Sequence, residues 1–300
     1  MSVHHTTLHQ LTIFDAVARH LSFARAAEEL HLTPPALSIQ VRHLSETLDQ
    51  TLYEQIGRQI YLTAAGEVVA KGCRDILTRL EGLSQELTAL QGLEQGRLRI
   101  AVLTTAKYFI PRLLGRFCAE HPGVEASLAV GNRKALLKRL VQNLDDLYIL
   151  GQPPEHIPVF AEPFADNLLV MVGRPDHPLA GINRIETTRL AQESFILREP
   201  GSGTRLATES YFKQQGVPLH TRMELGSNEA IKQTVLGGLG LAVLSDSTIR
   251  GELASGELVA LPVHGFPLRH KWHLVYPQGK APTPAAQAFA DFLFSSLPRA

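Results

Sequence analysis

Three stretches of the chain place hydroxyl or cationic side chains at the start of a predicted helix. Unpaired backbone N–H groups and the helix dipole favour an anion at such a position, and arginine holds a carboxylate or phosphate through paired hydrogen bonds. Taken singly, each stretch also fits a common helix cap or turn. Taken together, they follow strand ends, where open α/β sheets bind ligands, and they predict an anion site. The candidates are Thr104, Thr105 and Lys107, then Asn132 and Arg133, then Ser202, Thr204 and Arg205.

Motifs that could support catalysis or metal binding lack the context they need. The run "GGLGLAV" at 237–243 ends a predicted helix and opens a strand, the reverse of a dinucleotide loop, and fits a helix C-cap. No Gly-x-Ser-x-Gly elbow occurs in the sequence. His4, His5 and His270 have no partners at metal-binding spacing. We therefore expect neither an enzyme nor a metal site.

The elements that position the anion candidates begin near Arg97. Strands alternate with helices from there onward, a pattern that indicates βαβ units and mostly parallel sheets. The predicted strands are 97–104, 125–131, 146–151, 168–173, 194–199, 222–227, 240–245 and 272–277. The predicted helices lie near 106–119, 132–143, 204–215, 228–237 and 283–297. Proline-rich breaks near 153–163 and 262–267 predict two subdomains, 93–163 with 267–300 and 164–266, with a crevice between them.

The first 65 residues carry a different pattern, in which apolar residues at helical spacing precede two short β-like runs around Gly57. Ser22 is placed to cap a second helix, and Thr33 to cap a third with Pro34 at its first position. The third helix, from about 35 to 48, has an apolar face and an exposed face. The inner residues are Leu37, Val41, Leu44 and Leu48, and the outer ones are Pro35, Ser38, Ile39 and Arg42.

This order of elements predicts a winged helix-turn-helix domain over residues 1–65. Its third helix would enter the DNA major groove with the N-terminus first, so Thr33 and the outer residues are candidate DNA contacts. The alternative from the pattern alone is a three-helix structural bundle. The net charge of this segment differs from the positive charge that is usual for a DNA-binding domain, because the segment holds four arginines and six carboxylates.

Residues 66–92 predict a long helix that joins two copies of the chain. Its apolar residues alternate spacings of four and three, which makes a 3.5-residue seam suited to a coiled coil. The alternative is a helix that lies on its own domain, which would usually show a wider apolar face. Two winged domains joined in this way would read a pseudo-palindromic operator. The seam residues are Val69, Cys73, Ile76, Leu80, Leu83, Leu87 and Leu90.

Composition places the chain among soluble globular proteins. It has 300 residues, 44% of them hydrophobic, and 29 cationic against 29 acidic side chains, which suits two or three domains. The two cysteines, Cys73 and Cys118, are too few for a disulfide framework. No secretion signal and no apolar run long enough to span a membrane are visible. We expect a cytoplasmic protein with no membrane partner.

The stretch "LTIFDAVARHLSFARAAEELHLTPPALSIQVRHL", followed by "LTAAG", resembles the LysR-type transcriptional regulators without an internal gap. The resemblance implies an operator of double-stranded DNA, with Pro34, Pro35, Ser38 and Ile39 facing base edges. It also implies that Arg58, in the wing, reaches the DNA backbone or minor groove. Pro34 stands where glutamine is usual in the family, and its side chain cannot form a hydrogen bond to a base edge. Recognition of bases would therefore depend on Ser38 and on apolar contact with thymine methyl groups.

The later stretches "TTAKYFIPRLL", "VGNRKALLKRL", "REPGSGTR" and "GSNEAIKQTVLGGLGLAVLS" resemble the branch of that family that activates Calvin-cycle operons, including RuBisCO genes. This implies an α/β effector domain similar to type 2 periplasmic-binding proteins. It also implies a small anionic effector such as ribulose bisphosphate, 2-phosphoglycolate or NADPH, and no other cofactor. Cations on both subdomains, Lys107 and Arg133 against Arg205, would suit a doubly charged anion. The implied ligands are Thr104, Lys107, Arg133, Ser202, Thr204, Arg205 and Asn228.

The same resemblance implies a homodimer or homotetramer that contacts RNA polymerase. Effector closure of the two subdomains would change the angle between protomers, and with it the bending of bound DNA. Two alternatives remain at this stage. A LysR-type regulator of nitrogen or aromatic-acid metabolism would differ only in the crevice, and a stand-alone small-molecule binding protein would have no use for residues 1–92.

Overall fold

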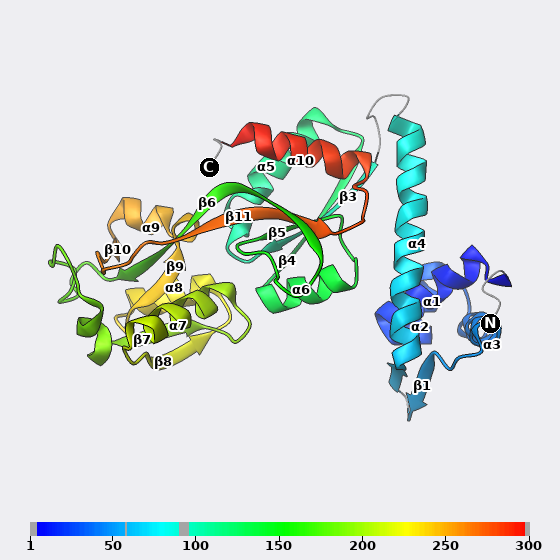
Figure 1. The fold of residues 1–300 in the computed structure, drawn as a ribbon, viewed down its shortest axis with the longest axis horizontal. Helices are drawn as coiled ribbons and strands as arrows, with labels where there is room; N and C mark the ends of the chain where they lie inside the picture. Colours follow the sequence, from blue (N-terminus) through cyan, green and yellow to red (C-terminus); the bar gives the residue numbers. More distant parts are fainter. Residues whose placement is uncertain (1–4, 58, 90–95, 298–300) are drawn as a thin grey trace. The chain divides into compact units, whose positions relative to one another are not determined.

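The computed structural model of the chain describes residues 5–57, 59–89 and 96–297 (Figure 1). The chain divides into two compact units, residues 1–88 with 142–144 and the remainder of 89–300. Each unit has hydrophobic core clusters of its own. Among the described residues, no helix is both long enough and apolar enough to cross a membrane.

The first unit has the fold of a winged helix-turn-helix. A capping box between Thr7 and Gln10 starts its first helix, and Ala26 and Ala27, only 0% and 3% exposed, let the second helix approach its neighbours closely. The two short strands pair antiparallel and form the wing. Its elements are α1 (Leu8–His20), α2 (Phe23–Leu30), α3 (Pro34–Leu48), β1 (Tyr53–Ile56), β2 (Gln59–Leu62) and α4 (Ala64–Ala89).

The long helix α4 begins by packing on its own domain. Cys73 is 1% exposed inside the core that α1, α2 and α3 form, and Val69 packs against the same core. The prediction that Cys73 contacts a second protomer is therefore wrong, and Val69 is drawn into the same intramolecular packing. The reason is that one apolar stripe serves two purposes: nearly three turns at the start of α4, as far as Cys73, cover the winged domain.

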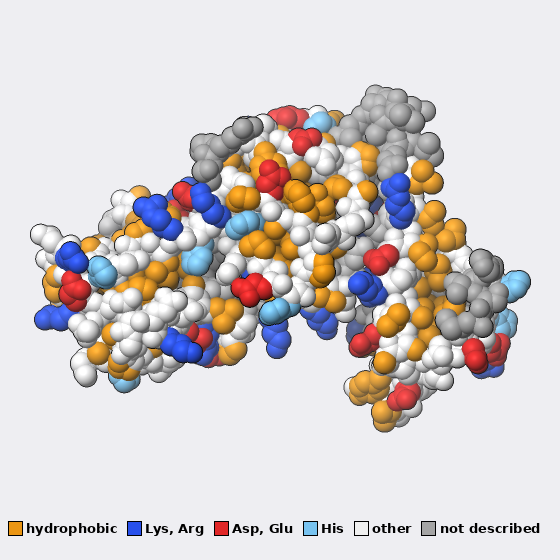
Figure 2. All heavy atoms as spheres, viewed as in Figure 1, with side chains coloured by type: hydrophobic (Ala, Val, Ile, Leu, Met, Phe, Trp, Pro, Cys, Tyr) orange, Lys and Arg blue, Asp and Glu red, His pale blue; other side chains and the backbone are white. Residues whose placement is uncertain are grey.

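Further along α4, the stripe is free of the winged domain. Ile76, Leu80 and Leu83 are 46%, 39% and 46% exposed, and apolar side chains follow the face of α4 that Figure 2 shows. The side chain of Leu87 and the whole of Leu90 lie outside the described residues. The role of the exposed stripe in dimerisation stays a prediction, now centred on these three residues.

The Cys73 thiol should react with thiol reagents far more slowly than the partly buried Cys118. Burial, with a smaller contribution from Asp15, raises the pKa of Cys73 to about 12, so roughly one thiol in ten thousand is ionised at pH 8. We expect labelling in the native protein to be at least about a hundredfold slower at Cys73. Mass spectrometry of the labelled peptides measures this, with denatured protein as the control. Equal native rates would show that Cys73 is accessible.

The second unit is built on a mixed seven-stranded sheet and a two-stranded parallel sheet. The large sheet has the order β10-β6-β11-β5-β3-β4, with β9 beside β6, and β7 pairs with β8 in the small one. The strands are β3 (Gly96–Leu103), β4 (Val124–Gly131), β5 (Leu147–Leu150), β6 (Val159–Gly173), β7 (Ser194–Arg198), β8 (His220–Leu225), β9 (Ala242–Ser245), β10 (Val259–Ala260) and β11 (Leu268–Pro277). The helices are η2 (Ala106–Tyr108), α5 (Ile110–Glu120), α6 (Arg133–Val141), η3 (Thr187–Gln192), α7 (Gly203–Gln215), α8 (Asn228–Leu236), η4 (Asp246–Thr248), α9 (Arg250–Ser255) and α10 (Pro284–Ser296).

Two long strands, β6 and β11, run antiparallel through the whole second unit (Figure 1). The sequence predicted only their ends, and it predicted a break where β6 in fact continues past Pro163. The ladder tolerates this proline because its register shifts there: Pro163 faces His273, whereas Ala165 faces Trp272. A proline fits beside such an irregularity because it has no N–H to give to the ladder. The prediction of mostly parallel sheets is also wrong for β6, β9, β10 and β11, which pair antiparallel.

Separate cores lie at the two ends of these strands. One surrounds β3, β5, α5 and α10 and includes Phe117 and Phe289. Another lies between β7, β9 and α7 and includes Phe195 and Phe212. The second unit thus consists of two α/β subdomains, as the fold class predicted, and β6 and β11 connect them.

Candidate functional site

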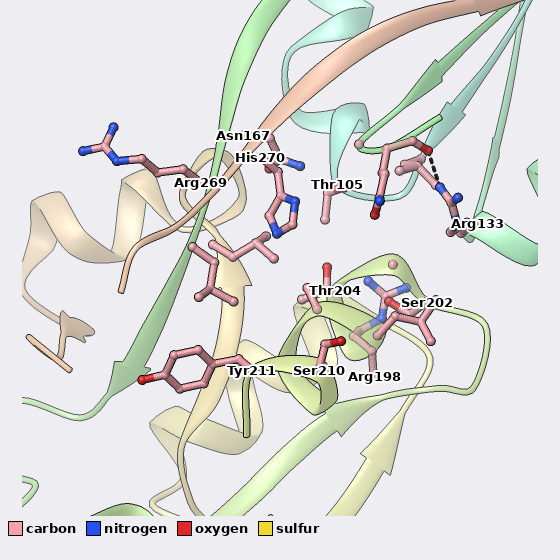
Figure 3. Close-up of a pocket in the computed structure, with 18 of the residues that line it drawn as sticks. Thr105, Arg133, Asn167, Arg198, Ser202, Thr204, Ser210, Tyr211, Arg269 and His270 are labelled. Carbon is pink, nitrogen blue, oxygen red and sulfur yellow. Dashed lines mark hydrogen bonds between the residues drawn. The ribbon is translucent and has the colours of Figure 1, made fainter. Parts of the chain in front are cut away.

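A cleft of about 780 Å³ lies between the two subdomains, where β3, β4, β5 and β7 end (Figure 3). A volume of this size suits a small metabolite. The residues that line it come from both subdomains and from the crossing strands β6 and β11. Of the predicted anion-site residues, those that line the cleft are Thr104, Thr105, Asn132, Arg133, Ser202 and Thr204.

The first turn of α7 offers backbone N–H groups to the cleft without a side-chain cap. Ser202 has the extended backbone of an N-cap residue, but its hydroxyl makes no capping hydrogen bond. Ser202 and Thr204 are only 2% and 9% exposed. The N-terminus of α6 differs, because Asn132 Oδ1 accepts a hydrogen bond from the Ala135 N–H at 3.0 Å. The open helix end at the cleft is therefore that of α7, and its free N–H groups favour an anion.

Arg133 lies across the cleft, on the other subdomain. Its guanidinium donates to the carbonyl oxygen of Gln152, a bond drawn in Figure 3, and to that of Pro153 at 3.3 Å. Burial lowers the pKa of Arg133, and the distant charge of Glu155 opposes this. Among the described residues, no carboxylate forms an ion pair with Arg133. A partly buried guanidinium held only by neutral carbonyls favours an incoming anion.

Arg198, which sequence reasoning missed, is a second arginine in the cleft wall, but its charge is balanced. It is 3% exposed, and its Nε and Nη2 donate to the two carboxylate oxygens of Glu199 at 2.7 and 3.0 Å. Burial acts to raise the pKa of Glu199, but hydrogen bonds from Arg198 and Asn132 outweigh it and lower that pKa. Arg198 also donates to Thr104 Oγ1 at 3.1 Å, which links the subdomains.

Three predicted ligands lie elsewhere. Lys107 places its Nζ 5.1 Å from the centre of the Tyr108 ring and does not line the cleft. Arg205 is turned away on α7 and pairs with Glu209 at 2.7 Å and with Glu224. The prediction that these two cations join Arg133 around an anion is wrong, because the helical turn that carries each one points its side chain away.

Asn228, the third of them, stands behind the cleft wall. Its side chain is 2% exposed, and its Oδ1 accepts a hydrogen bond from Arg198 Nη1 at 2.6 Å. Asn228 therefore orients Arg198 and does not line the cleft. Sequence reasoning also missed residues that line the cleft from the crossing strands and from one face of α7. Their spacing is equally typical of a face that packs into the core. They include Asn167, Ser210, Tyr211, Gln214 and His270.

On the first unit, the N-terminal half of α3 presents the predicted DNA-contacting residues at the surface. Thr33 takes the N-cap position without a side-chain cap bond, and Pro34 begins the helix. Ile39 is 49% exposed, Ser38 is half-buried, and Pro35, Thr33 and Pro34 are exposed. Because Pro34 and Pro35 have no N–H, Ala36 is the one residue among the first three positions of α3 that carries a backbone N–H for a phosphate.

Arg42, one turn further along α3, is exposed and forms no ion pair within the described part of the chain. It is therefore available for a phosphate contact. At the tip of the wing, Ile56 is 66% exposed. Arg58 lies outside the described residues, so its predicted contact with the DNA backbone or minor groove stays a prediction.

An exposed helix-turn-helix surface on one unit and a ligand-sized cleft between two α/β subdomains on the other define a DNA-binding protein with an attached sensor domain. Residues 8–67 match the family model described as "Bacterial regulatory helix-turn-helix protein, lysR family". Residues 91–298 match the model described as "LysR substrate binding domain". The chain belongs to the LysR family of transcriptional regulators, which are not enzymes.

Comparison with individual proteins places the chain within that family. It is 65% identical over 296 residues to the RuBisCO operon transcriptional regulator of Acidithiobacillus ferrooxidans, covering 99% of this chain and 96% of that protein. The structure of the Synechocystis PCC6803 CcmR regulatory domain in complex with 2-PG is 49% identical, with a TM-score of 0.66, and covers 68% of this chain and 98% of that one. A full-length OxyR variant from Pseudomonas aeruginosa, at 24% identity and a TM-score of 0.78 over 97% and 95% of the two chains, shares the fold.

Proposed function

We propose that this LysR-type regulator controls carbon-fixation genes, the RuBisCO operon among them, and senses a small phosphorylated or acidic metabolite in its cleft. The name and the 65% identity of the Acidithiobacillus relative support the choice of genes. The CcmR domain, 49% identical and described with 2-PG bound, supports the choice of 2-phosphoglycolate as the first effector to test. Ribulose bisphosphate and NADPH are the other candidates.

The observation that carries the effector proposal is the pairing of two anion-favouring groups from opposite subdomains. Arg133 belongs to the subdomain around β3, β4 and β5, whereas the open N-terminus of α7 belongs to the other. An anion bound to both would hold the subdomains together. Because such an anion makes all its contacts only in the closed arrangement, it would shift the population toward closure.

The two subdomains are already joined by hydrogen bonds that do not require a ligand. Arg198 donates to Thr104 at 3.1 Å, and Asn132 donates to Glu199 at 3.0 Å, each across the two subdomains. Tyr108 donates to Glu229 in the same way. An effector would therefore add to an existing set of contacts. It would change the balance between open and closed forms by as much as its affinity differs between the two.

Closure would reach the DNA through a dimer or tetramer joined by the exposed stripe of α4. A change of angle between protomers would alter the spacing of the two α3 helices on an operator and the bending of the DNA. Regulation would then depend on whether the bending of the bound DNA helps or hinders the binding of RNA polymerase.

Thermal-shift and calorimetric titrations of the full chain test the effector. At about a hundredfold excess over Kd, 2-phosphoglycolate is expected to stabilise the protein by about 2.7 kcal/mol, a rise in Tm of a few degrees. Glycolate, which lacks the phosphate, is the matched control and should do much less. Ribulose bisphosphate and NADPH are titrated alongside. If none of the anions shifts Tm or releases heat, the cleft is not a site for this class of effector.

The operator contacts of the regulator should depend on the effector. In DNase I footprints on a RuBisCO promoter fragment, we expect saturating 2-phosphoglycolate to change the length of the protected region or the hypersensitive sites that report DNA bending. The reason is that closure changes the protomer angle. Identical footprints under conditions where calorimetry shows the ligand bound would refute the coupling. Failure to bind the promoter at all would refute the choice of genes.

A further inference from the structure

His270 occupies a special position in the cleft, on a strand that belongs to both subdomains. It lies on β11 directly opposite Asn167 of β6, and both residues line the cleft. Figure 3 shows the His270 imidazole pointing into the cleft, whereas the side chain of its neighbour Arg269 points away. This alternation is the ordinary period of two along a strand. Arg269 also lines the cleft, but its side chain is turned outward, so a ligand that fills the cleft meets the imidazole directly.

The charges around His270 on its own pair of strands leave the imidazole without an ion-pair partner. On β11 the flanking residues are Arg269 and Lys271, and Lys271 is paired with Asp166 of β6 at 2.8 Å. The facing residue, Asn167, is neutral, and its Oδ1 accepts a hydrogen bond from Ser245 at 2.9 Å.

The opposite wall is equally short of negative charge. The α7 residues that line the cleft, Thr204, Ser210, Tyr211 and Gln214, carry no charge. Arg198 is balanced by Glu199, and Arg133 lies on the far side. Burial lowers the pKa of His270 below its ordinary 6.5, and no charged group contributes to that shift. The imidazole is therefore neutral near pH 7 while the cleft holds no anion.

We propose that His270 takes up a proton when an anionic effector enters the cleft and then donates a charged hydrogen bond to it, so that effector affinity depends on pH. The proposal rests on the proposed function of the cleft. Arg133 and the α7 N-terminus would hold one part of the anion, and His270 would supply a cation from the hinge strand only when the site is filled. The same residue would favour anions over neutral ligands of equal size.

The direction of the pH dependence follows from linkage. An anion near the imidazole favours its protonated form, so the pKa of His270 is higher in the complex than in the free protein. The filled site then binds more protons than the empty one. The extra affinity is fully present below the pKa of the free protein and is lost as pH rises through the pKa of the complex. A difference of one pH unit between the two pKa values corresponds to about a tenfold change in Kd.

Calorimetric titrations with 2-phosphoglycolate between pH 6.0 and 8.0 test the proposal on the full chain. The wild type is compared with His270→Asn and His270→Gln, which keep a hydrogen-bonding side chain but cannot titrate. His273→Asn is the matched control, because His273 lies on the same strand, is also half-buried with a lowered pKa, and does not line the cleft. The ligand's own phosphate titrates near pH 6, but it does so identically in all four proteins.

We expect Kd to rise with pH about tenfold more in the wild type and His273→Asn than in either His270 variant. Titration in buffers of different ionisation enthalpy should show up to about one additional proton taken up by the wild type. If all four proteins bind with the same pH slope and proton uptake, the inference is wrong and the proposed function stands. A loss of affinity in the His270 variants that is equal at every pH would also overturn it. If the wild type binds neither 2-phosphoglycolate nor ribulose bisphosphate nor NADPH, both proposals fail together.

Discussion

Replacing Arg133 with alanine is expected to weaken 2-phosphoglycolate binding by about 2 kcal/mol, or about thirtyfold in Kd. The guanidinium faces the cleft without a carboxylate partner among the described residues, because its hydrogen bonds go to the carbonyl oxygens of Gln152 and Pro153. Its loss removes a charge-assisted contact without leaving a buried carboxylate unpaired. Isothermal titration of the full chain measures the change, and the ligand-dependent rise in Tm should shrink with it.

Arg205→Ala provides the matched control for this prediction. Both arginines follow a strand at the start of a helix, but Arg205 is turned away and pairs with Glu209 and Glu224. The Arg205 variant should keep wild-type affinity, although it loses two partly exposed ion pairs, which contribute modestly to stability. The reverse outcome, a binding defect in Arg205→Ala and none in Arg133→Ala, would mean that the anion site lies elsewhere than in the cleft.

Placing aspartate at both Ile76 and Leu80 is expected to turn the protein into a monomer and to weaken operator binding by about a hundredfold or more. The two side chains are 46% and 39% exposed on α4, where a coiled-coil partner would cover them. Two carboxylates in such a seam would repel their counterparts on the partner helix. Operator affinity falls because one winged domain then binds without the second, which removes the gain from bivalent binding. Analytical ultracentrifugation and a gel shift measure the two effects.

A single aspartate at Thr78 serves as the control, since residue 78 lies about 200° around the helix from residue 76. Circular dichroism should show native helix content in all variants, because neither Ile76 nor Leu80 belongs to the core of the winged domain. A double variant that remains dimeric and binds its operator normally would show that α4 does not hold the protomers together.

These two predictions concern the two ends of one pathway. In the proposed mechanism, Arg133 and the α7 N-terminus would decide whether a ligand favours closure. The exposed stripe of α4 would decide whether closure in one chain affects a second chain. The pathway has a thermodynamic requirement, namely that the ligand must prefer one arrangement of the protomers over another. A ligand that binds both equally well would occupy the cleft without regulating anything.

The sequence by itself determined the elements that carry the function. Apolar spacing placed the helix from Pro34 to Leu48 to within a residue and separated its buried face from Ser38, Ile39 and Arg42. Residues such as Asn132, Arg133 and Ser202 were found because helix starts have a local chemistry: free N–H groups, capping side chains and a preceding strand. Such features depend on neighbours within a few positions in the chain, so a single sequence contains them.

Tertiary structure alone decided which of these groups meet. Arg198 ends a buried strand, and nothing in its local sequence shows that Asn228 and Thr104 contact its guanidinium. His270 entered the cleft because β11 crosses between the subdomains beside β6, a pairing between segments about a hundred residues apart. The period of two along a strand shows that alternate residues face opposite sides of the sheet. It does not show what lies on each side.

The same limit explains the predictions that the structure overturned. Cys73 and Ile76 belong to one apolar stripe in the sequence, yet the first faces its own domain and the second faces solvent. Lys107 and Arg205 stand at helix starts, as Arg133 does, yet their side chains point away from the cleft. Local periodicity fixes the direction of a side chain relative to its own element. Which surface it then meets depends on contacts between elements far apart in the chain, and these exist only once the fold is complete.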